Sequence, residues 1–413
     1  MDGAGGERRW ADLPGDLLAA VHLIAASAYD RARFAAVCTP WRAAAARHRP
    51  LPALPLLLLS TGDGRRDREA RAYSPEDGRV LRVPLPWFPW GNRLVGSFAG
   101  GWIATASGSE RLLVVNLFAG ARALSARQSA VVCACPRSDW ECGEAYQQRI
   151  TTDQISVRKI VFSEDPSTGG CILAAMTSWC NIALCRVGCP DSGWTTRGCG
   201  TNRYSCLVDI AFCNGVLYGF RFHELLRFDI GVNEDGAPVT ALVHRLDINM
   251  STLRMSDVSS DINYIFELRG KLAIAVRVWP AGGSHRAHFY RVFELMDDGR
   301  TPSSHRFRWA EVMSLGDQAL FLGPSCCKAV HVSTANRRGG VEGNRIYYSQ
   351  KHSSLRDSME CLARLDIGSC TVLSWESEGV HHLERIISQG YFYRKEDGIN
   401  GCNSSVWLLP PDF

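Results

Sequence analysis

Apolar residues in the first fifty positions recur every three or four residues, which is the spacing of one face of a helix. Within residues 12–27 the apolar stripe consists of Leu17, Leu18, Val21 and Ile24. Asp12 is a candidate cap, and Pro14 falls in the first turn, where its missing N–H costs nothing. The pattern predicts a short amphipathic helix.

A second stretch, residues 30–47, continues this spacing but is interrupted by Pro40. Its apolar series is Phe34, Val37, Cys38 and Trp41. Proline breaks a helix interior but is tolerated in a first turn. We therefore expect two helices, one capped by Asp30 and ending near Cys38, the next capped by Thr39.

Three helices in so short a segment carry more apolar side chains than their own core can hide. We expect the Leu-Pro start and the Val and Trp positions to dock on a partner. The alternative is that the helices only cap the larger domain.

From about residue 55 the helical spacing gives way to strand patterns, several of which begin at a glycine. These segments are residues 100–106, 214–220, 269–276, 343–349 and 389–395. Each of the first four segments is followed by a second strand. That strand ends in three residues of which the outer two are apolar and the middle one is acidic or an amide, at residues 115–117, 228–230, 293–295 and 365–367. The clearest unit is 215–230, with a tight turn near His223-Glu224.

Repeated strand–turn–strand units without a long helix predict an all-β array. A single sandwich of about 350 residues would need a larger core than domains build, whereas each blade of a β-propeller packs only on its neighbours. We therefore expect a multi-domain α plus all-β chain. It has a three-helix domain over residues 8–49, a linker leading into the first strand over 50–60, and a propeller of six or seven blades over 55–413. Long hairpin insertions are expected near 130–155, 280–288 and 334–342; two smaller β domains are the alternative.

Composition narrows the class of partner and the compartment. The net charge is only +4, and lysine occurs at five scattered positions, which argues against a nucleic-acid groove. These are Lys159, Lys271, Lys328, Lys351 and Lys395. The first ten residues are polar with no following apolar region, so no signal peptide is expected, and the apolar run 51–60 is about half of what a bilayer span needs. The sixteen cysteines are then expected to be reduced, in the cytoplasm or nucleus, and no membrane association is expected.

The N-terminal pattern resembles an F-box over about residues 10–48. It departs from the family at Thr39-Pro40, where a basic residue and Ser are more usual, and at His22, where the family often has an aliphatic residue. The resemblance implies binding to a Skp-family adaptor and, through it, to a cullin ubiquitin ligase. The residues assigned to that contact, or to its support, are Leu13, Pro14, Leu17, Leu18, Val21, Ile24, Phe34, Val37, Cys38 and Trp41.

The remainder of the chain resembles the domain that follows the F-box in many plant proteins, catalogued as domain of unknown function 295 and described as a KIB-type β-propeller. The resemblance is carried by residues 314–332, 343–350 and the chain end 407–413, with a further likeness at 181–196. Residues 205–212 depart from the family's more acidic pattern, which leaves the binding surface unassigned.

Together the two resemblances imply a non-catalytic substrate-recognition subunit of a Skp–cullin–F-box ubiquitin ligase. The helices would bind the adaptor, and the propeller would bind an unknown substrate protein, with a signalling kinase implied by relatives of this propeller type. Two alternatives are a ligase-independent propeller scaffold and a propeller that binds a sugar or another small molecule and carries a helical cap.

Other clusters are weaker candidates for chemistry. Cys180, Cys185, Cys189 and Cys199 have spacings unlike those of structural zinc sites, so we expect buried thiols and no metal. Cys326 and Cys327 cannot both face one side of a strand, which predicts packing roles. His381, His382 and Glu384 lack a third placed ligand, and the sequence contains no nucleophile elbow, metalloprotease motif or phosphate loop. No cofactor and no catalytic residue are expected.

Overall fold

The computed structural model describes a large part of the chain, in segments. These are residues 10, 13–25, 28–47, 53–59, 69–76, 78–84, 93–106, 111–127, 130–132, 157–177, 182–188, 194–197, 207–221, 224–253, 263–278, 289–299, 305–332, 340–351, 363–367, 370–376, 386–395 and 404–411.

The first fifty residues form three short helices, as their apolar spacing predicted. They are α1 (Gly15–Ile24), α2 (Ala28–Ala36) and α3 (Thr39–Ala46). Pro14 directly precedes α1, and Pro40 lies in the first turn of α3. Two predicted caps are wrong: α2 already begins two residues before Asp30, and Cys38 rather than Thr39 stands at the N-cap of α3. The N-cap of α1 is Pro14, and the predicted cap Asp12 lies outside the described residues.

Beyond the helices, the described strands form six sheets. The sequence predicted six or seven blades. The first sheet contains β1 (Leu56–Leu59), β2 (Glu69–Tyr73), β3 (Val80–Pro84) and β28 (Ser405–Leu408). The second contains β4 (Arg93–Phe98), β5 (Trp102–Ala106), β6 (Arg111–Asn116) and β7 (Arg122–Arg127). The third contains β8 (Ala130–Val132), β9 (Val157–Phe162), β10 (Ile172–Thr177), β11 (Ile182–Arg186) and β12 (Trp194–Arg197).

The other three sheets follow in chain order. The fourth contains β13 (Asp209–Cys213), β14 (Val216–Arg221), β15 (Glu224–Val232) and β16 (Pro238–Arg245). The fifth contains β17 (Ile248–Asn249), β18 (Asn263–Leu268), β19 (Lys271–Val278), β20 (Phe289–Asp297) and β21 (Phe307–Glu311). The sixth contains β22 (Gln318–Gly323), β23 (Cys326–His331), β24 (Arg345–Lys351), β25 (Ala363–Ile367), β26 (Cys370–Glu376) and β27 (Ile387–Lys395).

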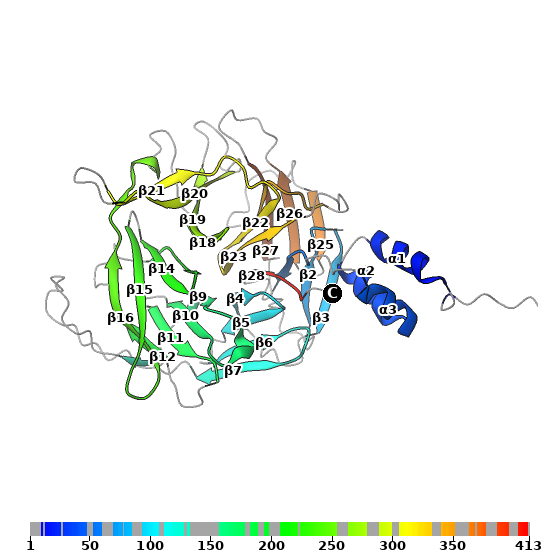
Figure 1. Cartoon of the computed structure of the whole chain (residues 1–413), viewed down its shortest axis with the longest axis horizontal. Helices are drawn as coiled ribbons and strands as arrows, with labels where there is room; N and C mark the ends of the chain where they lie inside the picture. Colours follow the sequence, from blue (N-terminus) through cyan, green and yellow to red (C-terminus); the bar gives the residue numbers. More distant parts are fainter. Residues whose placement is uncertain are drawn as a thin grey trace, which may run out of the picture.

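One strand from each sheet lines a central ring, which defines a β-propeller. The strands β28, β4, β9, β13, β18 and β23 contact one another in that order, and β23 returns to β28 (Figure 1). The closed ring explains why β28, from the end of the chain, pairs antiparallel with β1 near its beginning. It also confirms that the apolar run 51–60 leads into a buried strand, because Leu57, Leu58 and Leu59 are fully buried.

The core lies between neighbouring sheets rather than within one of them. Four apolar clusters each join two successive sheets, from the second and third to the fifth and sixth. A fifth apolar cluster joins the sixth, first and second sheets. Each sheet therefore buries its faces only against adjacent sheets, as the propeller interpretation requires.

The sixth sheet departs from the repeated hairpin pattern. Its spatial order is β23-β22-β24-β27-β26-β25, and β24 pairs in parallel with both β22 and β27. The segments 343–349 and 389–395, which the glycine pattern treats as two units, thus lie side by side in one sheet. The expectation that 343–349 and the strand ending at 365–367 form one strand–turn–strand unit is wrong, since β24 and β25 are not neighbours.

Candidate interaction surfaces

The three helices share a very small apolar core. Leu18, Phe34 and Ala44 are buried together, and Leu13 and Trp41 pack against them. The rings of Phe34 and Trp41 lie 4.5 Å apart, and the indole nitrogen of Trp41 donates to the backbone oxygen of Trp10 at 3.1 Å. A core of this size stabilises the helices weakly without support from elsewhere.

Three aliphatic side chains of the same unit point into solvent, and we call them the helical apolar surface. The exposed fractions are 49% for Leu17, 42% for Val21 and 58% for Val37. Leu17 and Val21 are four residues apart on α1 and therefore share a face. Exposed aliphatic residues on a small unit are characteristic of a surface that a partner covers.

The structure places the predicted adaptor-binding residues in three environments. Leu17, Val21, Val37 and Pro14 are exposed; Leu18 and Phe34 are buried; and Leu13, Cys38 and Trp41 are half-buried. The side chain of Ile24 lies outside the described residues. Of the predicted set, the exposed residues are those that a partner can contact directly, and the buried ones support them.

Two ion pairs join the helices to the first sheet. Asp30 of α2 lies 3.0 Å from Arg79 in the turn between β2 and β3, and Arg31 lies 4.0 Å from Glu76 in the same turn. The first pair is largely exposed, whereas the side chains of Arg31 and Glu76 are only 5% and 10% exposed. The helices therefore lie at the rim of the propeller beside β2 and β3, as Figure 1 shows.

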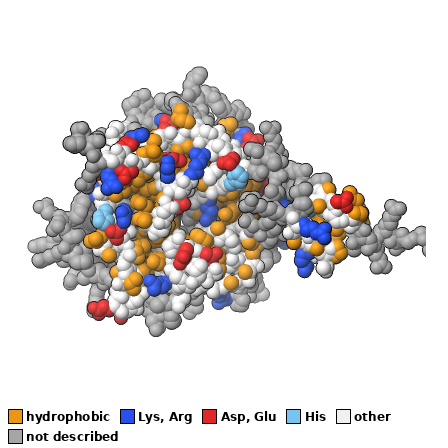
Figure 2. Space-filling view, viewed as in Figure 1, with side chains coloured by type: hydrophobic (Ala, Val, Ile, Leu, Met, Phe, Trp, Pro, Cys, Tyr) orange, Lys and Arg blue, Asp and Glu red, His pale blue; other side chains and the backbone are white. Residues whose placement is uncertain are grey.

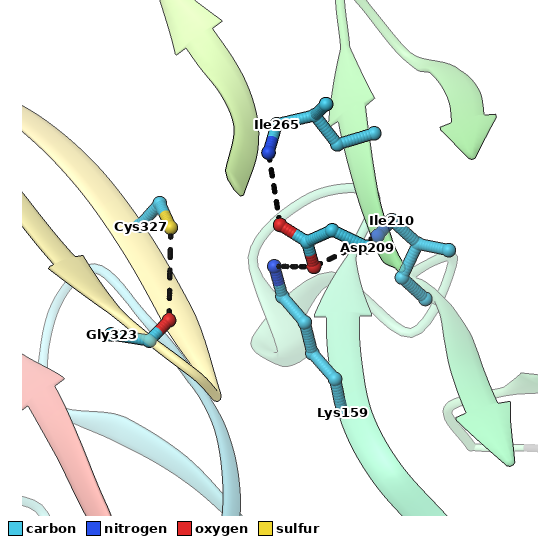
Figure 3. Close-up of polar contacts among 6 residues, drawn as sticks. All are labelled: Lys159, Asp209, Ile210, Ile265, Gly323 and Cys327. Carbon is cyan, nitrogen blue, oxygen red and sulfur yellow. Dashed lines mark hydrogen bonds and ion pairs between the residues drawn. The ribbon is translucent and has the colours of Figure 1, made fainter. Parts of the chain in front are cut away.

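The centre of the propeller contains a buried charge pair that the sequence analysis missed. The ammonium of Lys159 on β9 donates to the carboxylate of Asp209 on β13 at 2.6 Å, and both side chains are nearly fully buried (Figure 3). The same carboxylate accepts from the backbone N–H groups of Ile210 and Ile265, each at 2.9 Å. Burial alone would lower the pKa of Lys159, but the charge and hydrogen bond of Asp209 raise it above its ordinary value. The burial of Asp209 raises the pKa of its carboxyl, which the charge and hydrogen bond of Lys159 counteract. Through these hydrogen bonds the pair links the third, fourth and fifth sheets.

A second lysine from the central ring is in a different environment. Lys328 on β23 donates to the backbone oxygen of Ser97 at 3.3 Å, and its nitrogen lies 5.6 Å from the centre of the Phe98 ring. Burial lowers the pKa of this lysine. These contacts join the sixth sheet to the second.

Of the cysteines considered in the sequence as candidates for chemistry, those that the structure describes pack in or against apolar clusters. Cys185 is buried, and Cys180, Cys189 and Cys199 lie outside the described residues. Cys326 packs in the cluster around Trp407, while Cys327 packs against the cluster of the fifth and sixth sheets, so the two thiols face opposite sides as predicted. Among the described residues, no group of three or more metal-ligating side chains is present. His381, His382 and Glu384 also lie outside them.

Figure 2 shows basic and acidic side chains interspersed on one face of the propeller, with apolar side chains between them. Exposed polar side chains of the described residues form short contacts with one another, such as Arg306 with Asp297 at 2.9 Å and His244 with Asp229 at 2.7 Å. Among the helices of the described residues, none combines the length and apolar character needed to cross a membrane.

The closed ring of sheets and its exposed N-terminal helices define a β-propeller protein with an attached helical unit. A sequence model of the KIB1-4 beta-propeller family matches residues 72–374, which is more than half of the chain. The chain belongs to this family, and the expected KIB-type propeller is confirmed.

Individual proteins of similar sequence or fold match parts of this chain. An Arabidopsis thaliana protein named as an F-box protein is 28% identical over 169 residues, which are 40% of this chain and 41% of that relative. The chain therefore matches about two fifths of the relative's length. A chain of the yeast Nup82-Nup159-Nup116 nucleoporin complex aligns with a TM-score of 0.35 and 10% identity, over 62% of this chain and 74% of that one. The Cps50 (Swd1) β-propeller domain of Myceliophteria thermophila aligns with a TM-score of 0.30 and 11% identity, over 69% and 96%. At such TM-scores neither likeness bears on function.

Proposed function

We propose that this chain is the substrate-recognition subunit of a Skp–cullin–F-box ubiquitin ligase, acting in the cytoplasm or nucleus. Its helices bind a Skp-family adaptor, and its propeller binds the substrate protein. The observation that carries the proposal is the helical apolar surface of Leu17, Val21 and Val37, exposed on a unit whose own core is minimal. The F-box name of the Arabidopsis relative supports the same assignment.

In this role the chain performs no chemistry itself. Holding the adaptor at one end and the substrate on the propeller raises the effective concentration of the substrate near the ubiquitin-transferring subunits. The ion pairs of Asp30 and Arg31 with the turn between β2 and β3 support this role, because they hold the helices against the propeller.

The proposal is tested by the affinity of the purified full-length chain for a Skp-family adaptor. Leu17→Asp combined with Val21→Asp places two charges on an exposed face, so the fold is expected to persist while adaptor binding is lost. Val232→Asp, at a propeller residue that is 56% exposed, is the matched control and leaves binding unchanged. Leu13→Ala is a poorer probe, because Leu13 packs against the helical core and its truncation also tests folding.

Circular dichroism of each variant confirms that the comparison is between folded proteins. If the folded wild-type chain does not bind the adaptor, the ligase role fails.

A further inference from the structure

The chain departs from the F-box pattern at Thr39-Pro40, and the proposed function assigns no role to these two residues. A threonine followed by proline is the recognition element of proline-directed protein kinases. The sequence contains three Ser/Thr-Pro dipeptides: Thr39-Pro40, Ser74-Pro75 and Thr301-Pro302. Ser74 is 3% exposed, and Thr301 lies outside the described residues. Thr39 and Pro40 are both exposed.

The backbone around Thr39 is the junction between α2 and α3. Cys38 is extended, with φ −163° and ψ 174°, and Thr39 is the first residue of α3. The hydroxyl therefore belongs to a helix end next to an extended residue rather than to a packed helix interior. A helix of eight residues with little core needs only local opening to present this segment to a kinase.

Thr39 is also close to the helical apolar surface. Thr39 is two positions after Val37, a stretch of chain that spans at most about 7 Å, and the exposed fraction of Val37 is 58%. A group added to the Thr39 oxygen thus lies near Val37, one of the residues that the proposed function assigns to the adaptor.

We propose that Thr39 is a phosphorylation site for a proline-directed kinase and that its phosphorylation weakens adaptor binding; this inference rests on the proposed function. In the reaction the Thr39 hydroxyl oxygen attacks the γ-phosphorus of ATP, the bond to the β-phosphate oxygen breaks, ADP leaves, and the hydroxyl proton is released. The product is a phosphate ester that carries nearly two negative charges at neutral pH.

The phosphate acts on docking rather than on folding. Negative charge in the first turn of a helix is favourable, and Arg42 lies three residues further along α3, so the helix tolerates the modification. Covering the helical apolar surface with a partner would instead strip water from a dianion, which opposes binding. By linkage, bound adaptor should equally oppose phosphorylation of Thr39.

The test uses the purified full-length chain, ATP and a proline-directed kinase of the MAP-kinase or cyclin-dependent class. Peptide mass spectrometry is expected to find phosphate on Thr39 and to lose it in Pro40→Ala. The phosphorylated chain is expected to bind the adaptor about tenfold more weakly or worse, while the kinase-treated Thr39→Ala variant keeps its affinity and Thr301→Ala behaves as wild type. Saturating adaptor should also slow phosphorylation of Thr39.

Two results overturn the inference: no phosphate on Thr39, or a phosphorylated chain of unchanged affinity. They differ from failure of the proposed function, in which the untreated chain already does not bind the adaptor.

Discussion

The hydroxyl of Ser97 lies 2.6 Å from the backbone oxygen of Trp407, although 310 residues separate the two in the chain. Ser97 belongs to β4 of the second sheet, and Trp407 to β28, which completes the first sheet. The backbone N–H of Leu94 makes a parallel contact, donating to the hydroxyl of Ser404 at 2.8 Å. These two bonds join the end of the chain to the second sheet, and the indole of Trp407 bonds to Leu322 of the sixth sheet. The last strand therefore closes the ring, and the propeller depends on the C-terminal residues.

Trp407 is the residue on which this closure most depends. It is fully buried, its indole nitrogen donates to the backbone oxygen of Leu322 at 2.8 Å, and its ring meets Phe321 at 5.0 Å. Trp407→Ala is expected to lower the free energy of unfolding by about 3–5 kcal/mol, measured by guanidinium denaturation. Trp10→Ala removes a side chain that is 76% exposed and should change it by no more than about 0.5 kcal/mol. Equal effects of the two variants would contradict this account of closure.

The charge pair at the centre predicts a different pattern of stability changes. Lys159→Met leaves the Asp209 carboxylate buried without its cation, and we expect a loss of about 3–5 kcal/mol. The double variant Lys159→Met with Asp209→Asn carries no uncompensated charge and should recover part of that loss. Arg306→Met, which breaks an exposed pair with Asp297, is the control and should leave the denaturation midpoint nearly unchanged. A double variant less stable than Lys159→Met would refute this interpretation.

The sequence pattern predicted much of the fold because the propeller repeats a local unit. The alternation in residues 214–230 corresponds to β14 and β15, and these strands end at Arg221 and resume at Glu224, where a tight turn was expected. The helical spacing likewise located α1, α2 and α3. The order of the sixth sheet was not predictable in this way, because β24 lies between two parallel neighbours and no local turn specifies that pairing.

The buried pair was missed for a similar reason. Lys159 and Asp209 are 50 residues apart, and their contact arises only when β9 and β13 become neighbours in the ring. A signal was nevertheless present for Asp209, which is the single charge within the apolar run 207–212, whereas Lys159 directly follows Arg158 and does not stand out in this way. On the helices, spacing identified the apolar residues but did not separate exposed Leu17 from buried Leu18, which depends on how α1 packs on α3.

Close approach of ring strands predicts an intolerant glycine in β4. A Cβ atom at Gly96 would overlap the backbone oxygen of Ile160 on β9, and backbone cannot move aside as a side chain can. Gly96→Ala should therefore destabilise the protein by about 2 kcal/mol or more in thermal or chemical denaturation. In Gly231→Ala the new atom would lie 3.4 Å from the Cβ of Ala241, an ordinary contact, so a change within about 1 kcal/mol is expected. A Gly96→Ala protein as stable as Gly231→Ala would show that β4 and β9 are not in such close contact.

The thiol of Cys327 provides a test that depends on pH. Burial raises its pKa from the ordinary 9.0 to about 12, and its sulfur lies 3.7 Å from the backbone oxygen of Gly323 (Figure 3). Because alkylation requires the thiolate, iodoacetamide at pH 8 should modify Cys327 more slowly in the native chain than in urea, as followed by peptide mass spectrometry. Labelling of Cys327 that is equally fast in the native and the unfolded chain would contradict the raised pKa of this thiol.

The same raised pKa fixes the sign of a stability change in alkali. The unfolded chain releases the Cys327 proton near pH 9, whereas the folded chain holds it until about pH 12. The stabilising contribution is therefore complete below about pH 9 and is lost as the pH rises toward 12. Denaturation midpoints between pH 8.5 and 10.5 should consequently fall less steeply for Cys327→Ala than for the wild type. Identical slopes would mean that the thiol ionises equally well in both states, and the packing of Cys327 between the fifth and sixth sheets would then have to be looser than the structure shows.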